Sequence, residues 1–391
     1  MKAIFCYDGP FSKDEEGFYY GRNLNDQMFE RYFKVADSLE VIIRVRDIPQ
    51  VEAVKSMCRI ENSQISVTEC PNLSSARGML TQVPRALKLL ENRISNADIV
   101  FVRLPSNIGN LAISVCKKLR KKYLVEVVGC PWDAYWNYGL QGKILAFPAK
   151  KIMMYNVKNA PYVVYVTNEF LQKKYPTNGK SIGCSNVELV EMSDEVLQKR
   201  IERIKSYSSK NKFTIGTAAG LDVLFKGQEY IIRALGELKR KGITCFEYNL
   251  VGGGTGARLL KIAEECDVEE QFHIIGQIPH NKIFEWLDGI DIYAQPSRQE
   301  GLPRAMIEAM SRALPCIGAK TAGIPELIED KYVFTNSKTE INEICRILLD
   351  LIEDYNEIET TAIRNFEEAK KYQREILIER RTAFFKEFVE R

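Results

Sequence analysis

Short runs of β-type apolar residues alternate with amphipathic segments along most of this 391-residue chain. Strands that are apolar throughout and separated by helices form parallel sheets that are covered by helices on both faces. The pattern therefore predicts an α/β protein with two Rossmann-like, doubly wound parallel-sheet domains that face a cleft. The strand candidates are KAIFCYD, EVIIRVRD, QISVTEC, DIVFVRLP, YLVEVVG and YVVYVTN in the first half, then FTIGTAAG, YNLVGGG, QFHIIGQI, DIYAQPS and PCIGA.

The domain boundaries follow from a break in this alternation. Residues 193–212 are polar and charged and contain no strand candidate, so we interpret them as a linker. We expect an N-terminal, acceptor-side domain over residues 1–192 and a C-terminal, ligand-binding domain over residues 213–371. Residues 372–391 are expected to form a helix that could pack back on the first domain. Two domains suit the length, at roughly 100–200 residues each.

Composition excludes several classes of function. The net charge is only +3, from 55 basic and 52 acidic residues, which argues against nucleic acid as the main partner. The start, MKAIFCYDGPF, has no signal-peptide core, and no stretch approaches the roughly 18 apolar residues of a membrane span. Ten cysteines without a C-x-x-C pair indicate reduced thiols, so we expect a cytoplasmic protein. Two histidines, His273 and His280, are too few for a histidine-rich metal site.

Two carboxylates lie close to the start of one predicted helix, in RQEGLPRAMIEAMSRALPCIG at 298–318. Glu300 and Glu308 are separated by about 80° net and about 12 Å along a helix, so both can face one ligand. The free N–H groups of a helix start favour an anion such as a pyrophosphate. Carboxylates accept hydrogen bonds from vicinal hydroxyls. A ligand that contains a sugar, a pyrophosphate and a ribose fits this arrangement.

The segment around these carboxylates resembles the signature of retaining glycosyltransferases of family 4, which have the GT-B fold. The shared pattern is Glu300, seven residues, Glu308, and then a Gly-x-Pro-Glu loop at 323–326. The resemblance continues in KG at 226–227, VGGG at 251–254 and IGQIPH at 275–280. It is weaker over the first domain, which would hold the variable acceptor.

The resemblance implies roles for individual residues. Glu300 and Lys226 would be the catalytic residues, binding hydroxyls of the donor sugar and neutralising the diphosphate respectively. Glu308 would bind the ribose. The remaining donor-binding residues would be Gly301, Leu302, Pro303 and Arg304 at the sugar and diphosphate, Gln277 and Ile278 at the base, and Gly253.

One position departs from the family pattern. The family usually has an arginine five or six residues before the lysine, where this chain has Gly220 and Leu221. The diphosphate would then depend on Lys226 and the helix start, or on another arginine such as Arg304.

Each of these residues also has a purely structural interpretation. Glu308 could be a charge at the side of a buried helix, and Lys226 could be solvated surface. The VGGG stretch could be a tight turn, and His280 is better explained as a helix cap than as a catalyst.

The first domain offers weaker candidates for the acceptor side. Gly17 and Gly21 lie in a long loop that could close over a ligand or could be flexible surface. Trp132 and Asp133 could stack on a sugar and bind its hydroxyls, or the tryptophan could belong to the core. The basic run KKLRKK at 117–122 could attract anionic lipid headgroups or could be a solvated helix face.

The resemblance implies a retaining enzyme that moves a sugar from a UDP- or GDP-sugar to a hydroxyl of a glycan or lipid-linked saccharide, in cell-surface polysaccharide biosynthesis. It implies neither a cofactor nor a metal. Peripheral contact with the inner face of the membrane would suit such an acceptor. The alternatives are a nucleotide-sugar epimerase of the same fold and a catalytically inactive glycan-binding scaffold.

Overall fold

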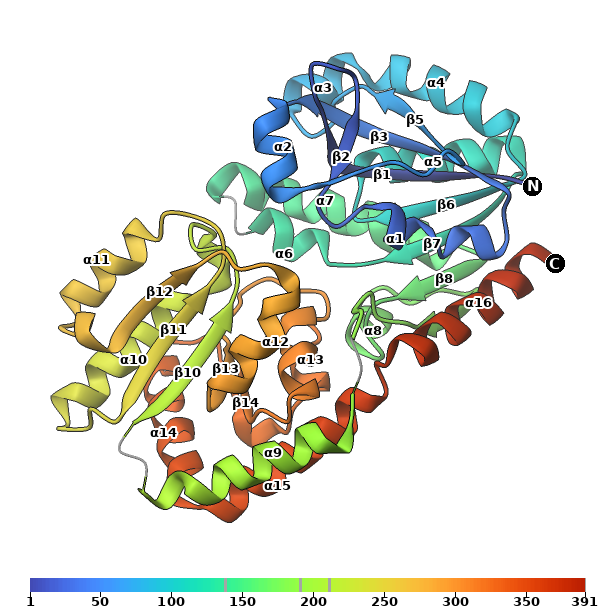
Figure 1. Cartoon of the computed structure of the whole chain (residues 1–391). Coiled ribbons are helices and arrows are strands. Elements are labelled where there is room, and N and C mark those ends of the chain that lie inside the picture. The colour runs from blue at the N-terminus through green and yellow to red at the C-terminus, as the bar shows by residue number, and fades with distance from the viewer. Residues whose placement is uncertain (137–138, 190–191, 210–211, 391) are drawn as a thin grey trace. The chain divides into compact units, whose positions relative to one another are not determined.

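The computed structural model describes residues 1–136, 139–189, 192–209 and 212–390 (Figure 1). The chain divides into two compact units. Unit 1 contains Met1–Cys184 and Leu377–Arg391, and unit 2 contains Ser185–Ile376. Each unit is a parallel sheet with helices on both faces, which confirms the predicted fold class.

Unit 1 is built on a parallel sheet with the strand order β5-β3-β1-β6-β7-β8-β9. Two short strands, β2 and β4, pair antiparallel at the far end of β1. The central strands are buried because their residues are apolar on both faces, as in β6, where every residue is buried. The strands are β1 (Lys2–Lys13), β2 (Tyr19–Gly21), β3 (Ser38–Asp47), β4 (Cys58–Arg59), β5 (Ile65–Cys70), β6 (Ile99–Leu104), β7 (Lys122–Val127), β8 (Tyr162–Tyr165) and β9 (Lys180–Gly183).

Helices from both ends of the chain cover the sheet of unit 1. The C-terminal helix α16 contributes Phe385, whose ring lies 5.9 Å from that of Tyr32 and 4.9 Å from that of Phe101. The helices are α1 (Asp26–Phe29), α2 (Gln50–Ser56), α3 (Ala76–Thr81), α4 (Val83–Ser95), α5 (Asn107–Leu119), α6 (Pro131–Trp136), α7 (Gly139–Lys158), α8 (Phe170–Lys174) and α16 (Arg374–Glu390), with a 3-10 turn at Tyr32–Lys34.

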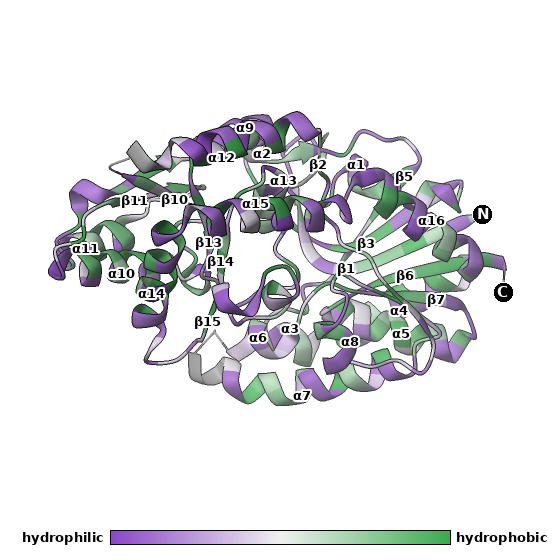
Figure 2. Ribbon diagram, turned by 90° about the horizontal axis from the view of Figure 1, so that it is seen from below, coloured by the Kyte–Doolittle hydropathy of each residue, from purple (hydrophilic) through white to green (hydrophobic). Residues whose placement is uncertain are grey.

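Unit 2 has a parallel sheet with the strand order β12-β11-β10-β13-β14-β15. In Figure 2 these strands mix hydrophobic and paler segments, since β11, for example, contains Glu247 and Asn249. They are β10 (Phe213–Ala218), β11 (Phe246–Val251), β12 (Phe272–Gly276), β13 (Ile292–Gln295), β14 (Cys316–Ala319) and β15 (Val333–Phe334).

The helices of unit 2 form two groups. One group is α10 (Gln228–Arg240) with α11 (Ala257–Glu265) and α14 (Glu340–Glu353). The other is α9 (Asp194–Lys205), α12 (His280–Gly289), α13 (Arg304–Ser311) and α15 (Tyr355–Lys370). Short 3-10 turns lie at Ser206–Ser209, Leu224–Lys226, Glu269–Gln271, Ile324–Glu326 and Asp330–Tyr332.

The structure changes the interpretation of residues 193–212. Where the sequence predicted a linker, Asp194–Lys205 form α9, which belongs to unit 2. The division between the units falls instead at 184/185, and the C-terminal segment that groups with unit 1 starts at Leu377 rather than at 372.

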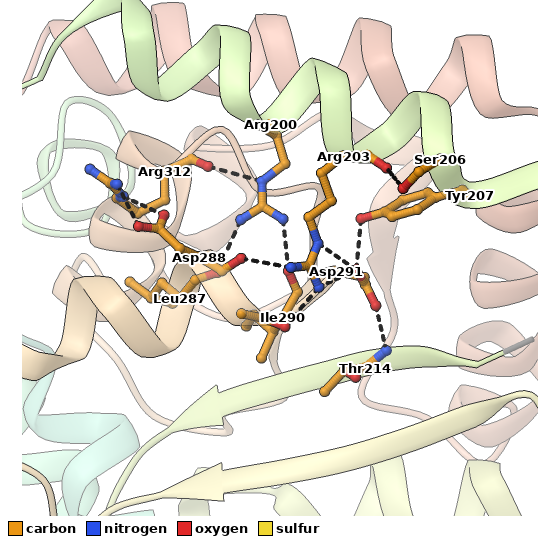
Figure 3. A network of polar contacts seen from close by, with 11 residues as sticks. Arg200, Arg203, Ser206, Tyr207, Thr214, Leu287, Asp288, Ile290, Asp291 and Arg312 are labelled. Atoms are coloured by element: carbon orange, nitrogen blue, oxygen red, sulfur yellow. Dashed lines mark hydrogen bonds and ion pairs between the residues drawn. The ribbon is translucent and has the colours of Figure 1, made fainter. Parts of the chain in front are cut away.

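Two arginines explain why so polar a helix is part of unit 2 (Figure 3). Arg200 is only 4% exposed, and its guanidinium donates to the carbonyl oxygens of Ile290 (2.7 Å), Leu287 (3.0 Å) and Arg312 (3.3 Å). These carbonyls include the end of α12, where helix oxygens have no intrahelical partner and a cation is favoured.

The second arginine contacts a buried carboxylate. Arg203 donates to Asp291 Oδ1 at 2.8 Å, and the Tyr207 hydroxyl donates to the same oxygen at 2.8 Å. The other oxygen, Oδ2, accepts from the Thr214 backbone N–H at 2.8 Å. The carboxylate, which is fully buried, thus connects α9 to the starts of β10 and β13.

We expect Arg200→Met to lower the free energy of unfolding by about 2–3 kcal/mol, because the helix end loses charge-assisted hydrogen bonds in a buried place. Urea denaturation followed by circular dichroism measures the change. The matched control is Lys199→Met on the same helix, whose exposed pair with Glu195 should contribute little to the free energy of unfolding. Equal losses in the two variants would contradict a structural role for Arg200.

Candidate functional site

The candidate site lies at the point where the strand order of unit 2 reverses. Strands β10 and β13 are neighbours, and the chain continues outward from them in opposite directions along the sheet. In open parallel sheets, ligands bind at this position, beyond the carboxyl ends of the strands. The loops at 219–227 and 296–303 follow these two strands, and they carry Lys226 and Glu300.

The structure brings Lys226 and Glu300 into direct contact. Lys226 Nζ donates to Glu300 Oε1 at 2.6 Å, and the side chains of the two residues are 24% and 12% exposed. Gln295 Nε2, from the end of β13, donates to the same carboxylate oxygen at 3.1 Å. Glu300 is therefore held by two donors at the edge of the sheet while part of its carboxylate still reaches solvent.

Buried polar groups fix the amide that holds Glu300. The Tyr293 hydroxyl donates to Gln295 Oε1 at 3.0 Å, and Gln295 Nε2 also donates to Ser297 Oγ at 2.8 Å. All three residues are almost completely buried. Because Gln295 has partners on both its oxygen and its nitrogen, its amide orientation is fixed, and so is the position of the donor that it offers to Glu300.

Glycine is required where the two loops approach each other. Gly227 has a φ of +70°, and a Cβ at this position would lie 2.0 Å from the carbonyl oxygen of Pro296. The Arg298 N–H donates to the Phe225 carbonyl at 2.7 Å, which ties the same loops together. The pair KG at 226–227 thus places Lys226 at the end of a 3-10 turn and opens α10 directly after it.

Glu308 lies further along, within α13. Its side chain is 13% exposed, and its Oε1 lies 3.3 Å from His280 Nε2 at the start of α12. This hydrogen bond raises the pKa of His280. The Glu188 charge adds to the rise, while partial burial and the Arg304 charge oppose it. Glu308 therefore lies on the side of α13 where its carboxylate contacts an exposed imidazole.

A glycine-rich loop after β11 lies beside the loop after β10. Asp222 accepts from the backbone N–H groups of Thr255 (2.8 Å) and Gly256 (3.0 Å), and these hydrogen bonds lower the pKa of its carboxyl group. A Cβ on Gly253 would lie 3.0 Å from Gln277 Oε1. The predicted donor residues Gly253 and Gln277 are thus brought together. Sequence reasoning missed Asp222, although it follows a strand in the same way as Glu300 does.

Most of the other predicted donor residues lie at the start of α13. The Gly323 N–H donates to the Gly301 carbonyl at 2.9 Å, which joins the Gly-x-Pro-Glu loop to the loop after β13. Leu302 and Pro303 are buried, whereas Arg304 is exposed at the first position of the helix. Among the residues that the structure describes, no side chain caps this helix start. Ile278 is half-buried between β12 and α12.

The arginine that precedes Glu300 is engaged elsewhere. The Arg298 guanidinium pairs with Glu340 and Asn336 and stacks on the Tyr230 ring at 3.9 Å. Arg298 therefore connects the loop after β13 to Glu340, Asn336 and Tyr230. The exposed Arg304 stays the predicted substitute for the missing family arginine.

In unit 1, the predicted acceptor residues lie in two separate places. Gly17, between β1 and β2, has a φ of +90° with open space around it. A Cβ on Gly21, the last residue of β2, would lie 1.9 Å from the Leu24 carbonyl oxygen, so glycine is needed where the chain turns after β2. The rings of Trp132 and Trp136 stack at 4.8 Å, and Asp133 lies 3.4 Å from Lys174 Nζ.

The described residues contain neither a metal-binding cluster nor a membrane-spanning helix. Within residues 1–136, 139–189, 192–209 and 212–390, no group of three or more His, Cys, Asp or Glu side chains could hold a metal ion. Among the helices in that part of the chain, none has the length and hydrophobicity that crossing a membrane requires.

Comparisons with known proteins show which sequences and folds are similar to this chain. Residues 198–369 match the family "Glycosyl transferases group 1". Protein CapJ of Staphylococcus aureus is 29% identical over 337 residues, 85% of this chain and 82% of its own length. The amylovoran biosynthesis glycosyltransferase AmsK of Erwinia amylovora is 39% identical over 111 residues, 27% of each chain.

Solved glycosyltransferase structures share the fold over the whole chain. Sucrose-phosphate synthase from Thermosynechococcus elongatus has a TM-score of 0.71 at 14% identity and covers 100% of this chain and 99% of its own. Anabaena HepE in complex with UDP has a TM-score of 0.64 at 17% identity and covers 100% of both chains. The chain therefore has the fold of GT-B glycosyltransferases, and the match to the glycosyl transferases group 1 family covers residues 198–369.

Proposed function

We propose that this group 1 glycosyltransferase moves a sugar, with retention of configuration, from a UDP- or GDP-sugar to a hydroxyl of a glycan or lipid-linked saccharide during synthesis of a cell-surface polysaccharide. The observation that carries the proposal is the Lys226–Glu300 pair at the strand-order switch of unit 2. Similarity to CapJ and AmsK, and to a HepE structure that contains UDP-glucose, supports the polysaccharide and the nucleotide-sugar.

The pair explains how a carboxylate can work beside a diphosphate. A lysine ammonium has three donors, and one of them is used on Glu300. The other two can reach phosphate oxygens, so Lys226 balances the charge of Glu300 and of the leaving group together. Glu300 then accepts hydrogen bonds from hydroxyls of the donor sugar, and Gln295 keeps its carboxylate oriented.

The transfer step in this proposal needs no positioned base. The bond between the anomeric carbon and the diphosphate oxygen breaks, and the bond to the acceptor oxygen forms on the same face. The departing diphosphate oxygen takes the proton of the acceptor hydroxyl. Lys226 and the N–H groups at the starts of α10 and α13 stabilise the negative charge that develops on the diphosphate.

Glu308, by the same proposal, binds the ribose. Its partly exposed carboxylate contacts His280 in the structure and can accept hydrogen bonds from two neighbouring hydroxyls. Gln277 and Ile278 would contact the base through the backbone, next to Gly253. The donor would thus extend from Glu300 to Glu308, with its diphosphate at the start of α13.

The first test removes the charge of Glu300. We expect Glu300→Gln to lower kcat about 10²–10³-fold, as for the loss of one oriented group at a reacting centre. The dissociation constant for UDP or GDP without the sugar should change less than about threefold. Turnover of radiolabelled donor and calorimetry measure the two effects, with the exposed Glu329→Gln as control. Equal losses of turnover and of nucleotide affinity would contradict a sugar-binding role.

The second test uses His280 as a reporter of Glu308. Because the Glu308 hydrogen bond is the largest cause of the raised pKa, we expect the pKa of His280 to fall in Glu308→Gln. Saturating uridine or guanosine should also lower it, if the ribose takes the carboxylate away from the imidazole. NMR titration measures the pKa, and His273→Gln identifies the signal because the chain has only two histidines.

The sign of this effect also fixes a pH dependence. A raised pKa in the folded protein means that the His280–Glu308 contact stabilises unit 2 at low pH and is lost as the pH rises through the His280 pKa. Binding of the nucleoside should therefore release a proton below that pH and strengthen as the pH rises. Nucleoside binding that leaves the His280 titration unchanged would show that the ribose lies elsewhere.

The third test concerns metal. We expect turnover to be unaffected by excess chelator, because the proposal neutralises the diphosphate with Lys226 and helix N–H groups alone. Turnover of labelled donor with and without EDTA measures this, and Lys226→Met in the presence of magnesium serves as the comparison. A chemical step that stops in chelator and resumes with magnesium or manganese would contradict the cation-free site.

A further inference from the structure

Helix α7 of unit 1 is apolar on its outer face as well as on its inner face. Ala146, Met153 and Val157 are buried and form the side that packs on the unit. On the opposite side, Ile144 is 75% exposed and Phe147 is 56% exposed. The same surface continues through Leu145, Ile152, Met154 and Tyr155, and Trp136 of α6 is also exposed. We call these exposed residues the α7 face.

Such a surface is unusual for a helix that covers a sheet. A helix of this kind normally has an apolar stripe toward the core and polar residues toward solvent. Figure 2 instead colours α7 with green and purple segments along its whole length. Contiguous exposed apolar side chains on a folded protein mark a surface that contacts a partner or a membrane.

The charged residues of α7 are all basic. The sequence from Asp133 to Glu169 contains no acidic residue between these two, whereas α7 itself contains Lys143, Lys150, Lys151 and Lys158. Lys151 Nζ lies 4.6 Å from the centre of the Phe147 ring, and Lys143 Nζ lies 5.1 Å from that of Trp136. Lysine ammonium groups therefore lie next to exposed aromatic side chains of the α7 face.

The basic run at 117–122 is less available than its sequence suggested. Lys118 pairs with Glu91, Lys121 donates to the Ala97 carbonyl, and Lys122 donates to the Val389 carbonyl. Lys117 lies 4.8 Å from the Tyr155 ring and so belongs to the surroundings of the α7 face.

We propose that the α7 face is a membrane-docking surface, which lies in the headgroup region of a bilayer that contains anionic phospholipid. The exposed apolar side chains would enter the boundary between headgroups and acyl chains, and the lysines would contact lipid phosphates. The combination of apolar and basic residues is that of interfacial helices.

Charge also decides against a second copy of this chain as the occupant. A two-fold dimer would place the same surface of each copy against the other, and the lysines of both copies would then meet without an acidic partner on α7. Anionic lipid supplies the missing negative charge. The docking proposal rests on the proposed function, because it identifies the membrane as the source of the acceptor for sugar transfer. Vesicle binding can nevertheless be tested without any transfer reaction.

The test is co-sedimentation of the full chain with phosphatidylglycerol–phosphatidylcholine vesicles and with phosphatidylcholine vesicles, at low and physiological salt. We expect strong binding to the anionic vesicles, weakened by salt. Ile144→Ser with Phe147→Ser should lower this binding at least tenfold. Lys143→Gln with Lys151→Gln should lower it severalfold and reduce its salt dependence.

The matched control is Leu260→Ser with Ile363→Ser, which removes two exposed apolar side chains of unit 2 and should leave vesicle binding unchanged. Thermal stabilisation by UDP or GDP should be the same in all variants, which separates docking from the donor site. A blue shift of tryptophan fluorescence on vesicles, lost in Trp136→Phe, gives a second measurement that does not depend on the serine variants.

Three outcomes would overturn the proposal. One is binding that ignores lipid charge. Another is vesicle binding that the serine substitutions on α7 leave intact. The third is a dimer in analytical ultracentrifugation that these substitutions dissociate, since it would assign the α7 face to contact between copies of the chain.

Discussion

The parallel pairing of β10 with β13 is the constraint on which the site of unit 2 depends. The ladder places Ile215 beside Ile292 and Gly216 beside Tyr293, so the loops after the two strands emerge at the same edge. A side chain at Gly216 would collide with Trp286 and Ile290, whose atoms would lie within 3 Å of its Cβ. Close packing of α12 on β10 thus requires glycine, and the ion pair between Lys226 and Glu300, 74 residues apart, follows from this arrangement.

Charge balance explains how acidic side chains can be placed where an anion is expected. Glu300 is paired with Lys226, and Glu308 lies 3.3 Å from His280, whose pKa this contact raises in favour of the charged imidazolium. A carboxylate that is already neutralised by a neighbour can accept hydrogen bonds from hydroxyls without repelling a phosphate. In the proposed function, the Lys226 N–H groups that do not contact Glu300 would be left for the diphosphate.

The fold class followed from the sequence because apolar periodicity determines which residues are buried. The candidate donor residues could be named from a motif, but their contacts could not, since the hydrogen bonds of Gln295 and Asp222 depend on strand order. Residues 193–212 were interpreted as a linker, and the helix α9 within them was missed, for a related reason. Arg200 and Arg203 look like solvated surface in sequence, and only the position of the carbonyls at the end of α12 shows that they are structural.

The KKLRKK run and the α7 face show what sequence alone can and cannot reveal about a surface. A run such as KKLRKK is visible in sequence, but its lysines turn out to have partners within unit 1. The apolar residues of α7 look in sequence like those of a core helix, because apolar side chains that face the sheet and those that face solvent have the same letters. Exposure separates the two sets. Since α7 contains lysines and no acidic residue, the proposed docking surface combines apolar side chains that could leave water with cationic groups that would contact anionic lipid.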